Sequence, residues 1–237
     1  MTTKTAQILR LDNATTRIAP FILFMAFIAI EEALRFAAQR QWFAMPDTTL
    51  NYLYPLKALS VGLLLYKYKD QYYELRLKDL QKLKTSVAIC GVGLLIFVMW
   101  ISADWMLSLT GPPSGFNPTL LPEGPIRGLM TAIRVAGAVL IVPLMEELFW
   151  RSFLLRYLID ADFESIPIGG FTWSSFLIST VLFGLEHHLF IAGMIAGAIY
   201  SVILYTTRSL AQCVFAHAVT NLALACYVLY TGKWYFW

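Results

Sequence analysis

The chain has 237 residues, of which 58% are hydrophobic and 14% charged, with a formal net charge of +3. This composition excludes an ordinary soluble domain, in which about half of the residues are apolar and about a quarter charged. The apolar runs are continuous and do not alternate with polar residues, which also excludes a transmembrane β-barrel. We therefore expect an all-α fold, a polytopic transmembrane helical bundle of seven to eight helices that forms one domain over residues 1–237.

Apolar segments near the length of ~20 residues that a helix needs to cross a bilayer recur along the whole chain. The expected spans, in chain order, are residues 18–38, 50–67, 86–107, 128–158, 171–188, 189–206 and 209–230. The fourth span is too long for one perpendicular crossing, so it must tilt, break or continue along the membrane interface.

The first span contains the charged residues Glu31, Glu32 and Arg35. Glu31 and Arg35 are four residues apart, so on a helix they share a face and can form an ion pair. We interpret this group as structural.

A basic segment, residues 67–84, separates the second and third spans and carries six Lys or Arg residues with three acids. Because loops rich in Lys and Arg stay on the cytoplasmic side, we expect a cytoplasmic loop whose leucines lie partly as an amphipathic helix on the membrane surface. Counting crossings from this loop makes the N-terminus cytoplasmic, together with Arg151, Arg156 and Arg208. We expect an integral protein of a bacterial cytoplasmic (inner) membrane.

The helices predicted in residues 128–230 contain the most informative ionisable residues. A charge within a span costs ~2.5–3.5 kcal/mol on insertion scales, so each is a functional candidate. Glu147 and Arg151 have the spacing of an ion pair on one helix face. Glu146 is turned about 100° away from Glu147, which leaves its carboxylate available to a neighbouring helix as a proton acceptor.

Two later helices also present polar faces. Phe183 and His187 are four residues apart, and so are His217 and Asn221, so each pair shares a helix face. A hydrolase needs a base that deprotonates water, a second group that holds or relays the proton, and donors aimed at the developing oxyanion. Glu146, His187, and His217 with Asn221 can supply these in that order.

Three ordered motifs carry a family resemblance: E-E-x-x-x-R at 146–151, F-x-x-x-H at 183–187 and H-x-x-x-N at 217–221. Each motif alone is weak, but the ordered trio on successive apolar helices resembles the CPBP family of intramembrane proteases, which includes the Rce1-type CAAX prenyl endopeptidases. Only His187 fits the register of the second motif, so we expect no catalytic role for His188. Members of this family often carry a small residue at the position of Glu186, so the resemblance implies no catalytic role for Glu186 either.

The resemblance implies an intramembrane endopeptidase of the glutamic type, without a metal or other cofactor, that cleaves a membrane-associated protein or peptide. It implies that Glu146 and His187 activate the attacking water and that His217 and Asn221 form the oxyanion site. The residues expected to support them are Glu147, Arg151 and Phe183. Apart from the substrate and the lipid bilayer we expect no partner, and in particular no nucleic acid.

Other interpretations remain open at this stage. Glutamates and histidines from three helices could hold a catalytic zinc ion, although the helical signature H-E-x-x-H is absent. The chain could be a catalytically silent scaffold or immunity-type protein of the same family. A transporter with a proton relay is a third alternative, although the sequence shows no internal repeat.

The predicted spans place the two motif histidines at different depths. At ~1.5 Å per residue, His217 lies about 12 Å into the last span from the cytoplasmic side, whereas His187 lies near the outer end of its own span. A shared site requires that the helices tilt or begin elsewhere, so that the two imidazoles come within about 12 Å of each other.

Overall fold

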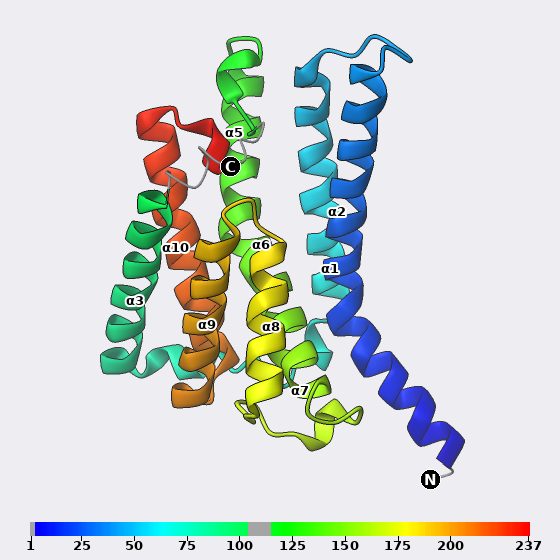
Figure 1. Cartoon of the computed structure of the whole chain (residues 1–237), viewed down its shortest axis with the longest axis vertical. Coiled ribbons are helices and arrows are strands. Elements are labelled where there is room, and N and C mark those ends of the chain that lie inside the picture. The colour runs from blue at the N-terminus through cyan, green and yellow to red at the C-terminus, as the bar shows by residue number, and fades with distance from the viewer. Residues whose placement is uncertain (1–2, 104–114) are drawn as a thin grey trace.

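Figure 1 shows the computed structural model, which describes residues 3–103 and 115–237. All regular elements in these residues are helical, and the predicted all-α bundle is confirmed. The α-helices are α1 (Thr3–Gln39), α2 (Leu53–Lys67), α3 (Leu83–Ser102), α5 (Pro125–Ala136), α6 (Val142–Glu147), α7 (Leu155–Tyr157), α8 (Trp173–Leu185), α9 (Phe190–Thr207) and α10 (Leu210–Thr231). Because α5, α6 and α7 are continuous from Pro125 to Tyr157, the described residues form seven long helices.

Four of these helices are long and apolar enough to cross a membrane: Leu83–Ser102, Pro125–Tyr157, Phe190–Thr207 and Leu210–Thr231. Their outward faces expose large apolar side chains such as Leu95 and Leu140, which water would disfavour and lipid solvates. The chain is therefore an integral membrane protein by length and composition of its helices.

The long α5–α7 helix lies in the middle of the bundle. It packs against α10 on one side, and α10 packs in turn against α3 and α9. The α1–α2 pair lies on its other side, while α8 packs along α9. The central helix, which carries the first motif, thus contacts both α8 and α10, which carry the other two.

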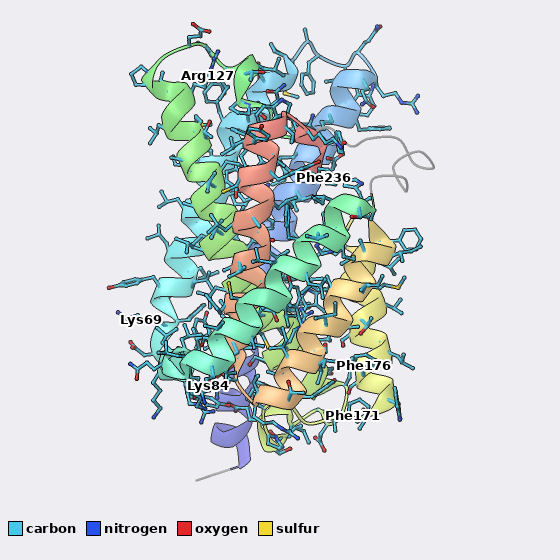
Figure 2. The ribbon with its side chains drawn as sticks, turned by 90° about the vertical axis from the view of Figure 1, so that its left-hand side faces the viewer. Lys69, Lys84, Arg127, Phe171, Phe176 and Phe236 are labelled. Atoms are coloured by element: carbon cyan, nitrogen blue, oxygen red, sulfur yellow. The ribbon has the colours of Figure 1, made fainter. Side chains whose placement is uncertain are left out.

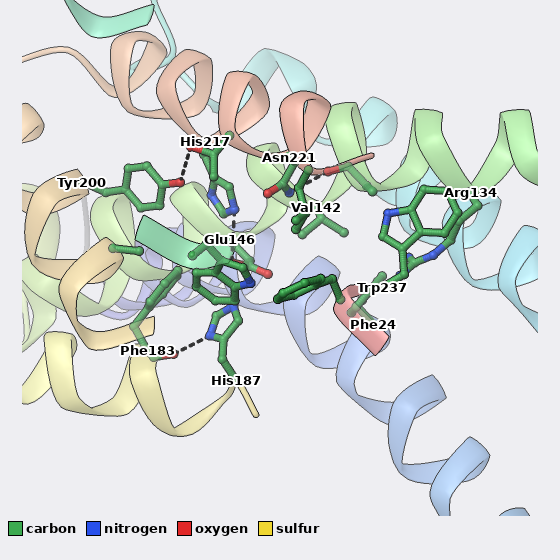
Figure 3. Close-up of a pocket in the computed structure, with 16 residues that line it drawn as sticks. Phe24, Arg134, Val142, Glu146, Phe183, His187, Tyr200, His217, Asn221 and Trp237 are labelled. Carbon is green, nitrogen blue, oxygen red and sulfur yellow. Dashed lines mark hydrogen bonds and ion pairs between the residues drawn. The ribbon is translucent and has the colours of Figure 1, made fainter. Parts of the chain in front are cut away.

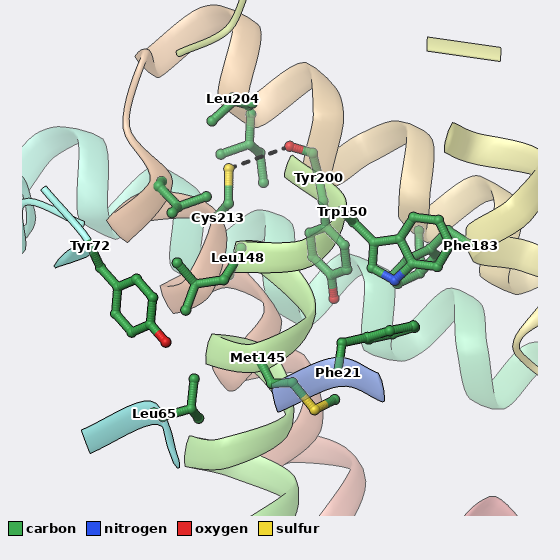
Figure 4. Packing of buried hydrophobic residues seen from close by; sticks show 14 of the residues in the cluster. Phe21, Leu65, Tyr72, Met145, Leu148, Trp150, Phe183, Tyr200, Leu204 and Cys213 are labelled. Carbon is green, nitrogen blue, oxygen red and sulfur yellow. Dashed lines mark hydrogen bonds between the residues drawn. The ribbon is translucent and has the colours of Figure 1, made fainter. Parts of the chain in front are cut away.

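The apolar residues beside the two glutamates fix the orientation of the central helix (Figure 4). Met145 and Leu148 are fully buried among Phe21 of α1, Leu65 of α2 and other core residues. Phe21 also stacks on Phe149 with ring centroids 4.0 Å apart.

The basic loop, part of which is predicted to lie amphipathically on the membrane surface, contains only short helical turns. Its regular parts are two short 3₁₀ helices, Lys69–Gln71 and Leu77–Gln81. Between them Glu74 turns into the protein, where the Arg17 guanidinium donates to its carboxylate from Nε and Nη2, each at 2.7 Å. The Ser152 hydroxyl also donates to it. This buried pair turns the middle of the loop inward, and the predicted lie of the rest of the loop on the membrane surface stays a prediction.

The surroundings of Glu74 control its charge. Burial acts most strongly and raises the pKa of this carboxyl, but the hydrogen bonds and charge of Arg17, helped by the Ser152 hydroxyl, outweigh it. The net result is a pKa below the usual range of a glutamate, so Glu74 stays ionised.

The basic loop between α2 and α3 lies at one end of the bundle, and the side of the membrane that this end faces stays a prediction. Figure 2 shows Lys69 and Lys84 at the end opposite to Arg127. Arg76 donates to the Arg208 carbonyl at 3.4 Å, which joins the basic loop to the turn between α9 and α10. Arg151 and Arg156, which the sequence placed with the cytoplasmic basic residues, are both buried inside the bundle and not at its surface.

The expected ion pair between Glu31 and Arg35 is wrong. Glu31 accepts from Nζ of Lys57 at 3.0 Å, whereas Arg35 lies 3.8 Å from Glu32. Lys57 is a buried cation on α2, and an unpaired buried charge is costly, so it takes the facing carboxylate of α1.

Candidate active site

The helix that carries Glu146 is widened on both sides of it. Residues Gly137–Ile141 and Leu148–Leu154 adopt π-helical hydrogen bonding, and α6 lies between them. Single π-helical turns inside an α-helix occur frequently at functional sites.

Proline explains part of this irregularity. The N–H of Val142 donates to the carbonyl of Gly137, five residues back. The next residue, Pro143, has no N–H, so the carbonyl of Ala138 loses the donor that this pattern would give it. Asn221 of α10 replaces that donor with its Nδ2, at 2.8 Å. The first π segment therefore also fixes where Asn221 lies.

A cavity of about 220 Å³ lies between the motif helices (Figure 3). All four predicted catalytic side chains line it: Glu146, His187, His217 and Asn221. Phe183 lines it too, whereas Glu147 and Arg151 lie behind its wall.

Glu146 is 5% exposed and projects into this cavity from α6. Its Oε2 is buried and accepts no hydrogen bond from the residues that the structure describes. The imidazole Nε2 of His217 is 3.9 Å away, beyond hydrogen-bonding distance. Leaving such an acceptor unsatisfied costs about 1–3 kcal/mol or more for a charged group, so a ligand in the cavity gains by donating to it.

Glu147 has two partners, not only the predicted one. Arg151 approaches it with Nε 3.2 Å from Oε2, as the spacing predicted. In addition, Nδ1 of His217 lies 2.9 Å from its Oε1. An ionised carboxylate only accepts hydrogen bonds, so Nδ1 of His217 carries a proton and Nε2 is directed toward Glu146.

His187 follows the end of α8 and is held by the backbone. Its Nδ1 lies 2.8 Å from the carbonyl of Phe183, which can only accept, so Nδ1 carries the proton and Nε2 keeps a lone pair. The ring of Phe183 lies 4.9 Å from the imidazole, and Trp100 of α3 approaches it edge-on at 5.2 Å.

The two imidazoles share the site in spite of the predicted difference in depth. The Phe183 ring lies between them, 4.9 Å from His187 and 6.4 Å from His217, so they are less than about 12 Å apart. The helix α8 has only 13 residues and is too short for a full crossing, which brings His187 inside the bundle.

Glu186 and His188, for which we expect no catalytic role, do not line the cavity. His188 is exposed, and Glu186 accepts a hydrogen bond from Nε1 of Trp150 at 3.1 Å. Sequence reasoning missed Tyr200, whose ring stacks on His217 at 4.8 Å and whose hydroxyl donates to Thr220. Tyr200 belongs to no motif and lies in an otherwise apolar helix, so no sequence pattern identified it.

The donor set bears on the zinc alternative. Among the residues that the structure describes, no three His, Cys, Asp or Glu side chains converge in a way that could hold a metal ion. Independence from metal remains a prediction for experiment.

Residues 128–223 match the family model of the Rce1-like type II CAAX prenyl endopeptidases. No curated protein and no solved structure matches the chain. The matched region contains all three motifs and most of the helices that carry them, so the resemblance seen in the sequence is confirmed there. The match supports a protease kind of enzyme.

Proposed function

We propose that this Rce1-like chain is an intramembrane endopeptidase of the glutamic type, with Glu146 and His187 activating water and His217 with Asn221 stabilising the oxyanion. One observation carries the proposal: the buried Oε2 of Glu146 lacks a donor among the described residues, in a cavity that it shares with two imidazoles. A water molecule between Glu146 and His187 would satisfy that oxygen.

The proposed reaction uses the lone pairs of Glu146 and His187 as proton acceptors. Glu146 takes a proton from water, with Nε2 of His187 as the second acceptor, and the hydroxide attacks the carbonyl carbon of the peptide bond. The tetrahedral intermediate collapses when the C–N bond breaks. The proton held at the site passes to the leaving nitrogen, which departs as an amine, and the other product is a carboxylic acid.

Asn221 and His217 can stabilise the oxyanion through protons that the fold leaves available. Nδ2 of Asn221 uses one N–H on Ala138 and retains a second. His217 can donate from Nε2 only when it is doubly protonated, and Glu147 then balances its positive charge. Arg151 pairs with Glu147 and holds it in place.

The substrate that fits this site is a membrane-associated protein or peptide, because the cavity lies within the apolar bundle. We further propose that the protein resides in a bacterial inner membrane with its N-terminus in the cytoplasm. The support is the basic loop between α2 and α3, whose Lys69 and Lys84 lie at the end of the bundle opposite to Arg127.

The test is cleavage of a library of lipid-anchored peptides by the purified chain in lipid nanodiscs. Glu146→Gln should abolish cleavage, while the matched variant Glu186→Gln, at a carboxylate outside the cavity, should retain it. Full activity of Glu146→Gln, or no cleavage by the unaltered chain, would overturn the proposal and favour the silent scaffold.

A second experiment tests the metal-free mechanism with chelators. Cleavage that survives EDTA and 1,10-phenanthroline supports this mechanism, whereas loss of cleavage that zinc restores contradicts it.

A further inference from the structure

Arg134 of α5 lines the same cavity as Glu146 and has no counter-ion among the described residues. Its Nε is buried and donates to no hydrogen-bond acceptor there. Figure 3 shows it with Trp237 at the end of the cavity away from His187. A guanidinium that borders a cavity in this state is a site for an anion.

Aromatic rings hold this guanidinium by its faces. Its Cζ lies 4.4 Å from the ring centroid of Tyr54 and 5.6 Å from that of Trp237. Such contacts stabilise the cation through its π faces and use none of the N–H groups, which lie in the guanidinium plane. These in-plane donors match the two oxygens of a carboxylate.

The surroundings of Arg134 contain more positive than negative charge. Lys57 and Arg134 contact the same ring, with Nζ of Lys57 5.3 Å from the Tyr54 centroid. Glu31 is occupied by Lys57, and Glu32, the partner of Arg35, is largely exposed. Arg35 also has a buried Nε without a hydrogen bond within the described part of the chain. An incoming anion would therefore find a net positive site.

We infer that Arg134 determines specificity by binding a carboxylate of the substrate, a step that rests on the proposed function. The carboxylate is either the free C-terminus of the substrate or an Asp or Glu side chain. A helix rises about 1.5 Å per residue, so Arg134 and Glu146 are about 18 Å apart along their helix, the span of about five extended residues. The carboxylate thus lies within about five residues of the cleaved bond.

The test measures binding to the full chain in lipid nanodiscs, with Glu146→Gln present to prevent turnover. The probes are N-acylated hexapeptides in two matched pairs: a free C-terminal acid against its amide, and an internal Glu against Gln in the amidated peptide. In at least one pair the peptide with the carboxylate should bind about tenfold tighter than its neutral partner. That pair shows whether the C-terminus or a side chain supplies the carboxylate.

Arg134→Gln should remove this preference, and Arg134→Lys should keep part of it because the charge remains but the paired donors do not. Arg40→Gln, at an exposed arginine, is the matched control and should keep it whole. Equal binding within both pairs, no binding, or a preference that survives Arg134→Gln would overturn the inference. If the carboxylate preference depends on Arg134 but the unaltered chain cleaves nothing, the carboxylate subsite stands and the proposed protease activity is rejected. If the chain cleaves peptides but shows no carboxylate preference, the protease activity stands and the subsite is rejected.

Discussion

Nδ1 of His217 lies 2.9 Å from Oε1 of Glu147, across the interface between α10 and α6. The second glutamate of the motif therefore orients a cavity imidazole while it holds Arg151. This contact makes Glu147 a positioning residue and leaves Glu146 as the carboxylate that faces the cavity.

Glu147→Gln tests this relationship. The amide is almost the same size, but it removes the negative charge that fixes the proton on His217 and balances Arg151. We expect kcat to fall by at least about 100-fold with a smaller change in KM, because the proton on the imidazole is misplaced. Steady-state kinetics and thermal unfolding in detergent would measure both effects. A variant that unfolds at lower temperature but keeps its kcat would show a purely structural role.

Asn221→Ala should affect both stability and rate. It leaves the Ala138 carbonyl without its donor, which costs about 1–3 kcal/mol of unfolding free energy. It also removes an oxyanion donor, for which we expect a loss of about 10²–10³ in kcat. If kcat per folded molecule stays the same, Asn221 serves only the π segment.

His187→Asn and His188→Asn form a matched pair of adjacent residues. His187 lines the cavity and keeps an Nε2 lone pair there, whereas His188 is exposed. We expect the first variant to lose at least about 100-fold in cleavage rate and the second to change by less than about threefold. Comparable losses in both would contradict the register assigned to the second motif.

Because Arg17 and Glu74 form a buried ion pair, we expect the stability of the folded protein to fall at acidic pH. Because the pKa of Glu74 is lowered in the folded protein, its contribution is complete above about pH 4.3, the range of an unfolded glutamate, and is lost as the pH falls through the lowered value. Thermal unfolding between neutral and acidic pH should show this loss.

Glu74→Gln removes that acid-dependent step and costs about 3–5 kcal/mol at neutral pH, since Arg17 is left buried without its counter-ion. Asp70→Asn, at an exposed carboxylate of the same loop, is the control and should retain the step. An unchanged acid profile in Glu74→Gln would show that other carboxyl groups cause the loss.

The helices could be predicted from sequence because a segment in lipid must satisfy its backbone hydrogen bonds within itself. The last span, expected at 209–230, is the helix Leu210–Thr231. The basic loop could not be predicted, since Glu74 pairs with Arg17, a residue 57 positions away. The π segment at Gly137–Ile141 likewise uses a donor from α10, which helical periodicity does not reveal.

Sequence patterns likewise identified only part of the candidate site. Spacing within a helix identified the pair Glu147–Arg151, and the family resemblance grouped the four residues that line the cavity. The contact between Glu147 and His217 joins residues 70 positions apart, so no local pattern announces it. Arg134 was missed for the same reason, because its surroundings come from Tyr54 and Trp237.

The central claim is that Glu146, with His187, activates water for attack on a peptide bond. Its most direct test is a single turnover of the unaltered chain in water labelled with heavy oxygen, followed by mass spectrometry of the product and of the peptide containing Glu146. We predict one labelled oxygen in the new carboxylate of the product and none in Glu146. Label in Glu146 with an unlabelled first product would show attack by the carboxylate itself and contradict the account.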